Sequence, residues 1–312
     1  MGAVHDLIEA RGAKAARESD TSDRRAVEAA LRFMGDEDPD SAYVYSGWAQ
    51  SALPHKRLAD DREWILKTDH VTLVVEPGRR LGPDAKTTVP IGVPFGSRAR
   101  LILIYLQTEA LRTSSREVEL GGSLREWLRR MGISIGGKST KEVREQAERI
   151  ARCRMSFHIS RGGRVGLVNQ SIVDTSMFVD DGSEPGQGSL FVETAKLSEG
   201  FYEQLKKHPV PVQEAAIRAI SNNSAALDVY VWLAYRLHSL AAPKPITWKA
   251  LHAQFGGGVA RLDNFRIQFR DALGMALAVY PEARVEEEGP GLVLHPSRPP
   301  ISPRLVAAQK RG

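Results

Sequence analysis

Cysteine is almost absent from this sequence, because Cys153 is the only one among 312 residues. The chain therefore cannot form an internal disulfide, and it lacks the thiolate cluster of a zinc or iron–sulfur site. The arginines beside Cys153 would lower the pKa of its thiol, but the neighbouring Ile150 and Ala151 favour a buried structural cysteine. The eight histidines do not cluster, and no H-E-x-x-H motif occurs. We expect neither a metal nor another cofactor.

Long apolar runs are also missing. The longest, around 101–104, is far shorter than the roughly 20 residues that cross a bilayer. The first residues lack the charged start and apolar stretch of a secretory signal. From these absences we expect a cytoplasmic protein with no membrane partner.

Charge of one sign is in modest excess. Lysine and arginine total 43 against 38 for aspartate and glutamate, which gives a formal net charge of +5. The position of this charge therefore matters more than its total, and a polyanion such as nucleic acid is the most economical partner. A length of 312 residues with 42% hydrophobic composition favours about two domains.

Changes in composition divide the chain. Residues 1–40 are predicted to form a mobile arm, with one helix from Asp23 to Met34 that the polar run at 35–40 ends. Residues 41–207 form the first predicted domain and 208–300 the second, with a joint near Pro209 and Pro211. Residues 301–312 form a basic tail.

The order of elements in the first domain is typical of a winged helix-turn-helix. A strand is predicted at 72–76, followed by helices at 97–112, at 124–131 (capped by Ser123) and from Ser139 to Arg152. A hairpin follows, with strands at 155–160 and 165–178, because Gly162-Gly163 supplies the positive φ of a tight turn.

The same order returns in the second domain. Helices are predicted at 213–220, 224–240, 248–255 and 261–280, with Ser224 and Thr247 as caps, and a glycine-rich turn at 256–258 precedes the last helix. A hairpin at 284–295 follows. The predicted fold class is α+β, with tandem winged helix-turn-helix domains and flexible basic termini.

The helix at 261–280 has the residue types of a base-reading helix. The apolar residues of this helix form one stripe that would face the core. Arg261, Asn264 and Gln268 lie on or beside the opposite side of the helix. Arginine suits guanine, and asparagine or glutamine suits adenine, in the major groove. Arg266 and Arg270 of this helix are predicted to contact the DNA backbone. An ordinary solvated helix face remains the alternative interpretation.

The helix at 139–152 is predicted to contact the DNA backbone rather than bases, because glutamates alternate with its cations and pair with some of them. The predicted contacts are Lys138, Lys141, Arg144, Arg149 and Arg152.

At the hairpin tip that follows, Arg161 and Arg164 would hold a phosphate. The tip of the second hairpin, with Glu286, Glu287 and Glu288, would repel phosphates. The tail, with Arg298, Arg304, Lys310 and Arg311, would add salt-dependent affinity or only solubility.

Residues Gly132 to Ser139 match the phosphate-loop pattern G-x-x-x-x-G-K-[ST]. A nucleotide-binding loop of this kind follows a buried strand and opens a helix. Here the preceding residues 124–131 carry four charges at helical spacing, which a central strand would not tolerate. We therefore interpret the segment as a helix-turn-helix turn with Lys138 near a DNA phosphate.

Several ordered blocks of the sequence resemble the RepA family of plasmid-encoded replication initiators. They include Trp-Leu-Arg-Arg-Met-Gly-Ile at 127–133 and Trp-Lys-Ala-Leu-His-Ala-Gln-Phe-Gly at 248–256. The others lie at 106–113, 115–121, 222–228, 235–240, 278–281 and 294–297. The resemblance covers roughly residues 40–300 and leaves out the first 40.

The resemblance implies binding to repeated sites (iterons) in double-stranded DNA at a plasmid origin, melting of nearby A·T-rich DNA, and recruitment of the host initiator and replicative helicase. It also implies a monomer at the origin in equilibrium with a homodimer that represses its own gene. The C-terminal domain would be the main reader, and the N-terminal one would contact DNA nearby or dimerise. No catalytic residue is implied.

Two other functions remain open on the sequence. A winged-helix transcriptional regulator would read duplex DNA with the same residues but would not initiate replication. A nucleotide-hydrolysing origin factor would use Gly132 to Ser139 as a true phosphate loop.

Overall fold

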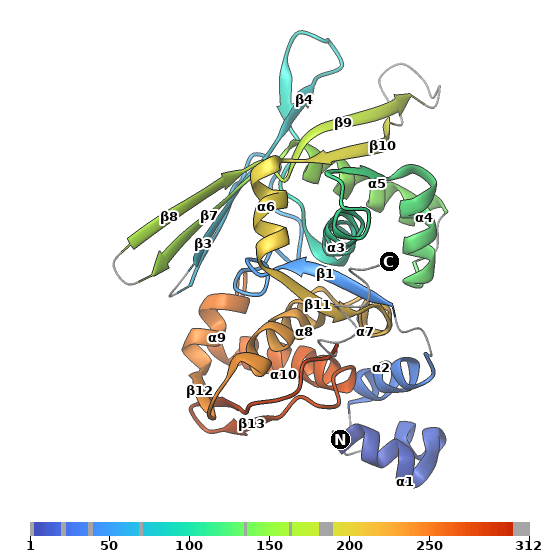
Figure 1. Cartoon of the computed structure of the whole chain (residues 1–312), viewed down its shortest axis with the longest axis vertical. Helices are drawn as coiled ribbons and strands as arrows, with labels where there is room; N and C mark the ends of the chain where they lie inside the picture. The colour runs from blue at the N-terminus through green and yellow to red at the C-terminus, as the bar shows by residue number, and fades with distance from the viewer. Residues whose placement is uncertain are drawn as a thin grey trace. The chain divides into compact units, whose positions relative to one another are not determined.

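The computed structural model describes residues 3–19, 23–36, 40–68, 71–133, 136–161, 164–180 and 190–301. The chain divides into two compact units (Figure 1). Unit 1 combines Met1–Gln50 with Pro209–Gly312, and unit 2 is Ser51–His208. The predicted boundary near residue 208 agrees with this division, whereas the first 50 residues belong with the C-terminal part of the chain. Among the described residues, no helix is both long enough and apolar enough to cross a membrane.

The N-terminal segment of unit 1 differs from the predicted mobile arm. Helices α1 (Ala3–Arg17) and α2 (Arg24–Met34) form there. As predicted, Asp23 caps α2 by accepting a hydrogen bond from the Arg25 N–H at 3.0 Å. Val27 and three alanines of α2 are buried, where the helix contacts α7 (Glu214–Ile220) and α10 (Leu262–Ala278). The arm prediction is wrong for the described part because this apolar face belongs to the core of unit 1.

One strand pair joins the two chain segments of unit 1. Strand β1 (Ser41–Tyr45) runs antiparallel to β11 (Pro209–Gln213), with Tyr43 opposite Pro211. The backbone N–H of Glu214 also donates to the carbonyl of Asp40 at 3.0 Å. Residues 40–45 are therefore fixed by a part of the chain more than 160 positions away.

The C-terminal part of unit 1 confirms the predicted winged helix. Its elements, in chain order after α7, are α8 (Ser224–Arg236), the 3-10 helix η1 (Leu237–Ser239), β12 (Lys244–Thr247), α9 (Trp248–Phe255), α10, β13 (Val285–Glu288) and β14 (Gly291–Leu294). The strands form one antiparallel sheet in the order β12-β14-β13. Thr247 caps α9 as predicted, but Asn223, rather than Ser224, caps α8.

Unit 2 is built around helix α3 (Gly96–Arg112), which is buried along most of its length. Helices α4 (Gly121–Arg130), α5 (Gly137–Arg152) and α6 (Glu199–Lys207) contact it. Helices α4 and α5 begin two residues before the serines predicted to cap them. Ser123 and Ser139 therefore lie within the first turn, and neither caps its helix.

The described strands of unit 2 form three sheets. The first has the order β2-β3-β7-β8, with β2 (Trp64–Lys67), β3 (Val71–Glu76), β7 (Arg154–Arg161) and β8 (Arg164–Gln170). The second has the order β6-β10-β9, with β6 (Glu117–Glu119), β9 (Val173–Asp180) and β10 (Leu190–Leu197). The third is a two-stranded ribbon of β4 (Arg79–Leu81) and β5 (Thr88–Pro90).

Comparison of the two units shows which hairpin is the wing of unit 2. In unit 1 the order is helix, strand, helix, helix and hairpin, and the first strand pairs with the last. In unit 2 the matching elements are α3, β6, α4, α5 and the β9–β10 hairpin, because β6 pairs with β10 and α5 contacts both β9 and β10.

The predicted wing was the other hairpin, β7–β8, and this assignment is wrong. That hairpin pairs with β3 in the four-stranded sheet. In Figure 1 the two hairpins extend in different directions. The residues between β9 and β10, 181–189, lie outside the described part of the chain.

Candidate nucleic-acid interface

Aromatic side chains hold the helix-turn-helix of unit 1. The rings of Trp248 and Phe255, at the two ends of α9, lie 6.1 and 5.4 Å from the ring of Phe269 on α10. Trp232 of α8 contacts Phe255 at 5.3 Å. All four rings are buried. Core packing therefore fixes the rotation of α10 and decides which of its side chains point outward.

Hydrogen bonds close the turn between α9 and α10. The ring Nε2 of His252 lies 2.6 Å from the carbonyl oxygen of Val259, so Nε2 is the donor. The Val259 N–H donates to the carbonyl of Gly256 at 2.8 Å. Gly258 has a φ of +88°, a conformation that glycine adopts without strain. His252 thus stabilises the turn that precedes α10.

The predicted base-reading residues lie together on the exposed face of α10. Asn264 and Gln268 are exposed, one turn apart, and make no side-chain hydrogen bond to any described residue. Arg261, the residue before the helix, has a side chain that is 76% exposed, with its nearest carboxylate, Asp263, 4.0 Å away. Two donor–acceptor amides and one guanidinium therefore face outward from the helix that follows the turn.

Arg266 and Arg270 have intramolecular partners. Arg270 forms a two-pronged ion pair with Glu287 of the wing, with Nε–Oε2 at 2.9 Å and Nη2–Oε1 at 2.6 Å. This hydrogen bonding lowers the pKa of Glu287. Arg266 lies 3.7 Å from Asp263, and both guanidiniums lie over the Trp248 ring. To contact the DNA backbone as predicted, each guanidinium would have to bind a phosphate in addition to its carboxylate partner or in place of it.

Two exposed lysines of unit 1 were missed by the sequence analysis. Lys249 lies in the first turn of α9, and Lys244 begins β12. The first helix of a helix-turn-helix crosses the DNA backbone, so Lys249 belongs among the phosphate-contact candidates. The signal in the sequence is a lysine directly after the cap and first residue of that helix, Thr247 and Trp248.

The cations of α5 in unit 2 fall into two groups. Lys138 is 91% exposed, with Glu142 4.0 Å away, and Lys141 is exposed too. Arg144 is half-buried. Arg152 forms an ion pair with Glu148 at 3.3 Å and donates to the Arg79 carbonyl at 3.4 Å. The N-terminal turns of α5 therefore offer the accessible positive charge.

The prediction that Arg149 contacts the DNA backbone is wrong. Its side chain is 3% exposed. It donates to the carbonyl of Val93 at 3.0 Å, to Asp60 at 3.2 Å and to Glu145 at 2.7 Å. Burial raises the pKa of Asp60, but hydrogen bonds and charge from Arg57 and Arg149 lower it overall. Arg149 thus joins α5 to residues 60 and 93 and cannot reach a phosphate.

A cleft of about 650 Å³ lies beside α5, between that helix, the base of the β4–β5 ribbon and the segment around residue 60. Besides the buried Arg149, its lining contains four cationic and three acidic side chains: Arg57, Arg80, Lys141 and Arg144, with Asp60, Glu145 and Glu148. The cleft therefore has a net positive lining, which fits the predicted contact of α5 with a phosphate backbone.

The structure places helix α4 directly before the phosphate-loop pattern at Gly132 to Ser139. A nucleotide-binding loop follows a buried strand instead, so the context predicted for a helix-turn-helix turn is the one found. Gly132 has a φ of +73° as α4 ends. Residues 134 and 135 lie outside the described part of the chain.

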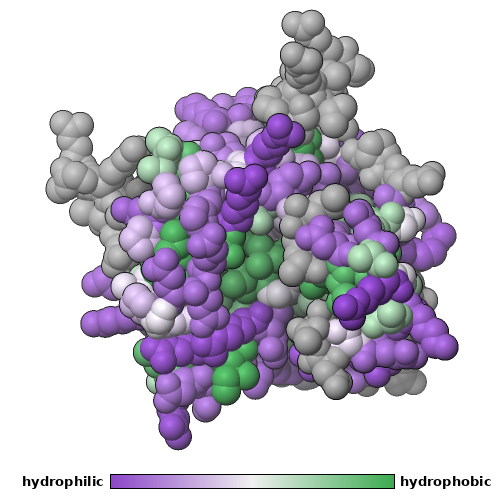
Figure 2. Space-filling model, turned by 90° about the horizontal axis from the view of Figure 1, so that it is seen from below, coloured by the Kyte–Doolittle hydropathy of each residue, from purple (hydrophilic) through white to green (hydrophobic). Residues whose placement is uncertain are grey.

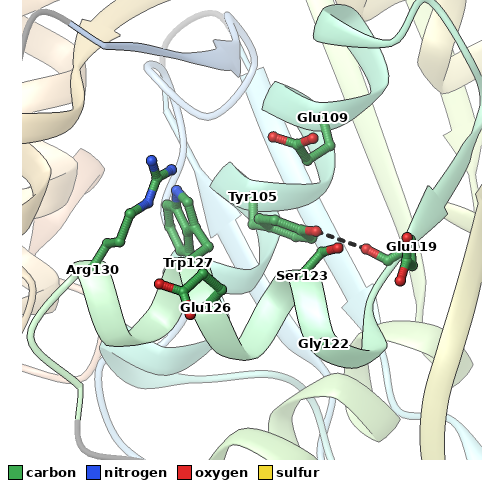
Figure 3. Close-up of a pocket in the computed structure, with 8 residues that line it drawn as sticks. All are labelled: Tyr105, Glu109, Glu119, Gly122, Ser123, Glu126, Trp127 and Arg130. Carbon is green, nitrogen blue, oxygen red and sulfur yellow. Dashed lines mark hydrogen bonds between the residues drawn. The ribbon is translucent and has the colours of Figure 1, made fainter.

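A second hollow in unit 2, of about 440 Å³, has the opposite charge (Figure 3). It lies between α3, β6 and α4, where the Tyr105 hydroxyl donates to the carbonyl of Glu119 at 2.7 Å. Glu109 and Glu126 also line it, with Arg130 as the one cation. Because its carboxylates would repel phosphates, we exclude this face of α4 from the candidate interface.

Some predicted contacts cannot be placed. Gly162-Gly163 and the side chains of Arg161 and Arg164 lie outside what the structure describes, as do residues 302–312 with Arg304, Lys310 and Arg311.

Cys153 is confirmed as a buried structural thiol. It is 3% exposed, and burial raises its pKa to about 12.

Two solved structures of domains 2 and 3 of RctB are similar to this chain. A selenomethionine derivative has 10% sequence identity and a TM-score of 0.51, and the match covers 83% of this chain and 99% of that one. The other has 10% identity and a TM-score of 0.46, with coverage of 80% and 94%. The first match supports the fold. No curated protein sequence matches the chain.

The fold and the placement of α10 define this chain as a tandem winged-helix protein. Its sequence between residues 93 and 250, about half of the chain, matches the family described as plasmid encoded RepA protein. The chain belongs to this family of plasmid replication initiators.

Proposed function

We propose that this protein initiates plasmid replication by binding specific sites in double-stranded DNA at the plasmid origin, with α10 of unit 1 as the base-reading helix. Membership of the RepA family supports the role in replication. The observation that carries the proposal is the outward face of α10, where Arg261, Asn264 and Gln268 follow a helix-turn-helix turn. These side chains match the major-groove edges of guanine and adenine.

In this proposal unit 2 holds the DNA backbone. Lys138 and Lys141 supply exposed charge at the start of α5, and the cleft beside them has a net positive lining. The family further supports binding to repeated sites, melting of A·T-rich DNA, recruitment of the host initiator and helicase, and exchange between monomer and homodimer. The proposal contains no catalytic step and no cofactor. The glycine-rich turn before Lys138 follows a helix, whereas a nucleotide-binding loop follows a buried strand. We therefore assign Lys138 to a DNA phosphate and not to a nucleotide.

Footprinting and titration on the origin of the protein's own plasmid test the base-reading assignment. We expect Arg261→Ala, Asn264→Ala and Gln268→Ala each to weaken binding by about 1–3 kcal/mol, which is roughly 5- to 150-fold, and to relax base preference. The matched control is Arg24→Ala, which removes an exposed arginine of unit 1 on α2. Equal affinity of the wild-type protein for origin and unrelated DNA would overturn the proposal.

A replication assay separates an initiator from a transcriptional regulator with the same fold. The protein is supplied in trans to a plasmid that carries only the origin. We expect the wild-type protein to maintain this plasmid and Asn264→Ala to lose it. Specific binding to the same DNA without plasmid maintenance would assign the protein to regulation instead.

A further inference from the structure

We propose that Ile267 of α10 reads the 5-methyl group of thymine in the major groove, so that the recognised site contains a thymine opposite this position. The inference rests on the proposed function, and it adds an apolar, specificity-determining contact to the polar side chains named above.

Ile267 is apolar but has no place in the core. Its side chain is 60% exposed, one of five large hydrophobic side chains that are exposed in the described part of the chain. At 100° per residue, it lies about 200° from Phe265 and from Phe269, whose rings face the core. The face of the molecule in Figure 2 is largely hydrophilic, with small, interrupted apolar areas. Because 60% of the Ile267 side chain stays in water, most of its apolar area is left available for a contact outside the chain.

The neighbours of Ile267 indicate what that contact is. Asn264 and Asp271 lie one turn before and after it, Gln268 is next to it, and all three are exposed. Asparagine and glutamine pair with adenine N6 and N7. In an A·T pair the thymine methyl lies in the same groove, beside these adenine atoms. Asn264 and Gln268, beside Ile267, therefore favour the base pair that carries a methyl group.

The chemistry of the side chain leaves one major-groove partner. Isoleucine has no donor, acceptor or charge, so it cannot read a base through hydrogen bonds or hold a phosphate. The thymine methyl is the apolar group among the groove features that distinguish base pairs. Contact with it removes both the methyl and the end of the Ile267 side chain from water, which is favourable.

The test removes the methyl group from the DNA. Deoxyuridine keeps the hydrogen-bonding groups of thymine and lacks its methyl, so each thymine of the footprinted site is replaced by deoxyuridine in turn. We expect one or two positions at which the replacement weakens wild-type binding about fourfold, the effect of one buried carbon group. Ile267→Ala should bind thymine and deoxyuridine at these positions equally, and Ile267→Val should keep part of the difference.

Two controls separate this contact from other effects. Leu81→Ala removes an equally exposed aliphatic side chain, 66% exposed in the β4–β5 ribbon of unit 2, and should keep the wild-type response to deoxyuridine. The dependence of affinity on salt should be the same for Ile267→Ala and wild type, because no phosphate contact is lost.

The possible outcomes are distinct. A wild-type protein that prefers its origin but tolerates every deoxyuridine overturns this inference and leaves the proposed function standing. An Ile267→Ala variant that still responds to deoxyuridine also overturns it, because the response then comes from DNA shape. Loss of self-association in Ile267→Ala, without a deoxyuridine response in wild type, would assign the side chain to a protein contact. A wild-type protein that does not prefer its origin overturns the proposed function and this inference together.

Discussion

At the scale of single residues, the surroundings of a guanidinium decide what an arginine can do. Arg261 extends into solvent, whereas Arg149 is enclosed by Asp60, Glu145 and the carbonyl of Val93. Both arginines were predicted to contact DNA from their positions in the sequence. Helical spacing cannot distinguish them, because the carboxylate that draws Arg149 inward lies 89 positions away.

Glu287 provides a prediction about pH. The hydrogen bond from Arg270 lowers its pKa in the folded state from the ordinary 4.5. The pair therefore stabilises the fold above that ordinary value, and the contribution is lost as the pH falls through the lower, folded-state pKa. In chemical denaturation at pH 7, Glu287→Gln should lower the free energy of unfolding by about 0.2–1 kcal/mol. The difference from wild type should disappear in acid below the folded-state pKa.

Glu288→Gln is the matched control, since Glu288 is exposed on the same strand and forms no ion pair with a described residue. Its unfolding free energy should stay within about 0.5 kcal/mol of wild type. An equal loss in both variants, with the same pH dependence, would show that the charge of the wing matters and the Arg270 pair does not.

At the scale of elements, the wing of unit 1 depends on one close approach of backbones. Gly291 is paired with Thr247 across β12 and β14, and a Cβ built on Gly291 would lie 1.9 Å from the carbonyl oxygen of Ile246. Gly291→Ala must therefore force the two strands apart. We expect the free energy of unfolding of unit 1 to fall by about 2–4 kcal/mol in thermal unfolding, above the roughly 1 kcal/mol that is typical of one substitution.

Gly289, in the turn that precedes β14, is the control. A Cβ there meets nothing within 4 Å, so Gly289→Ala should unfold within about 0.5 kcal/mol of wild type. Equal losses at the two glycines would contradict the close approach and would indicate that turn conformation alone limits this hairpin.

At the scale of the whole molecule, we propose that unit 1 reads bases and unit 2 contacts the DNA backbone. The double variant Lys138→Ala with Lys141→Ala should lower the slope of log affinity against log salt by about 2, because each phosphate contact contributes about 0.9. Its preference for origin over unrelated DNA should not change. Asn264→Ala should show the reverse pattern, an unchanged slope and a reduced preference. Identical changes in both variants would contradict the division between base reading and backbone contact.

The sequence by itself determined most of the helices and the winged-helix order of unit 1. Apolar residues at helical spacing predicted α3, α5, α8 and α10, and the caps Asp23 and Thr247 were identified correctly, because both signals depend on residues within one or two turns. The outward face of α10 followed from the same spacing. For this face the tertiary structure added the aromatic packing that fixes its rotation.

Only the tertiary structure decided which distant segments come together. It showed that α2 packs in unit 1, that β1 pairs with β11, and that β9–β10, not β7–β8, is the wing of unit 2. A glycine-rich turn predicts that a hairpin forms, but it does not indicate the sheet in which the strands of that hairpin pair. Strand pairing and the burial of Arg149 depend on partners tens to more than a hundred residues away, and no local period in the sequence encodes such contacts.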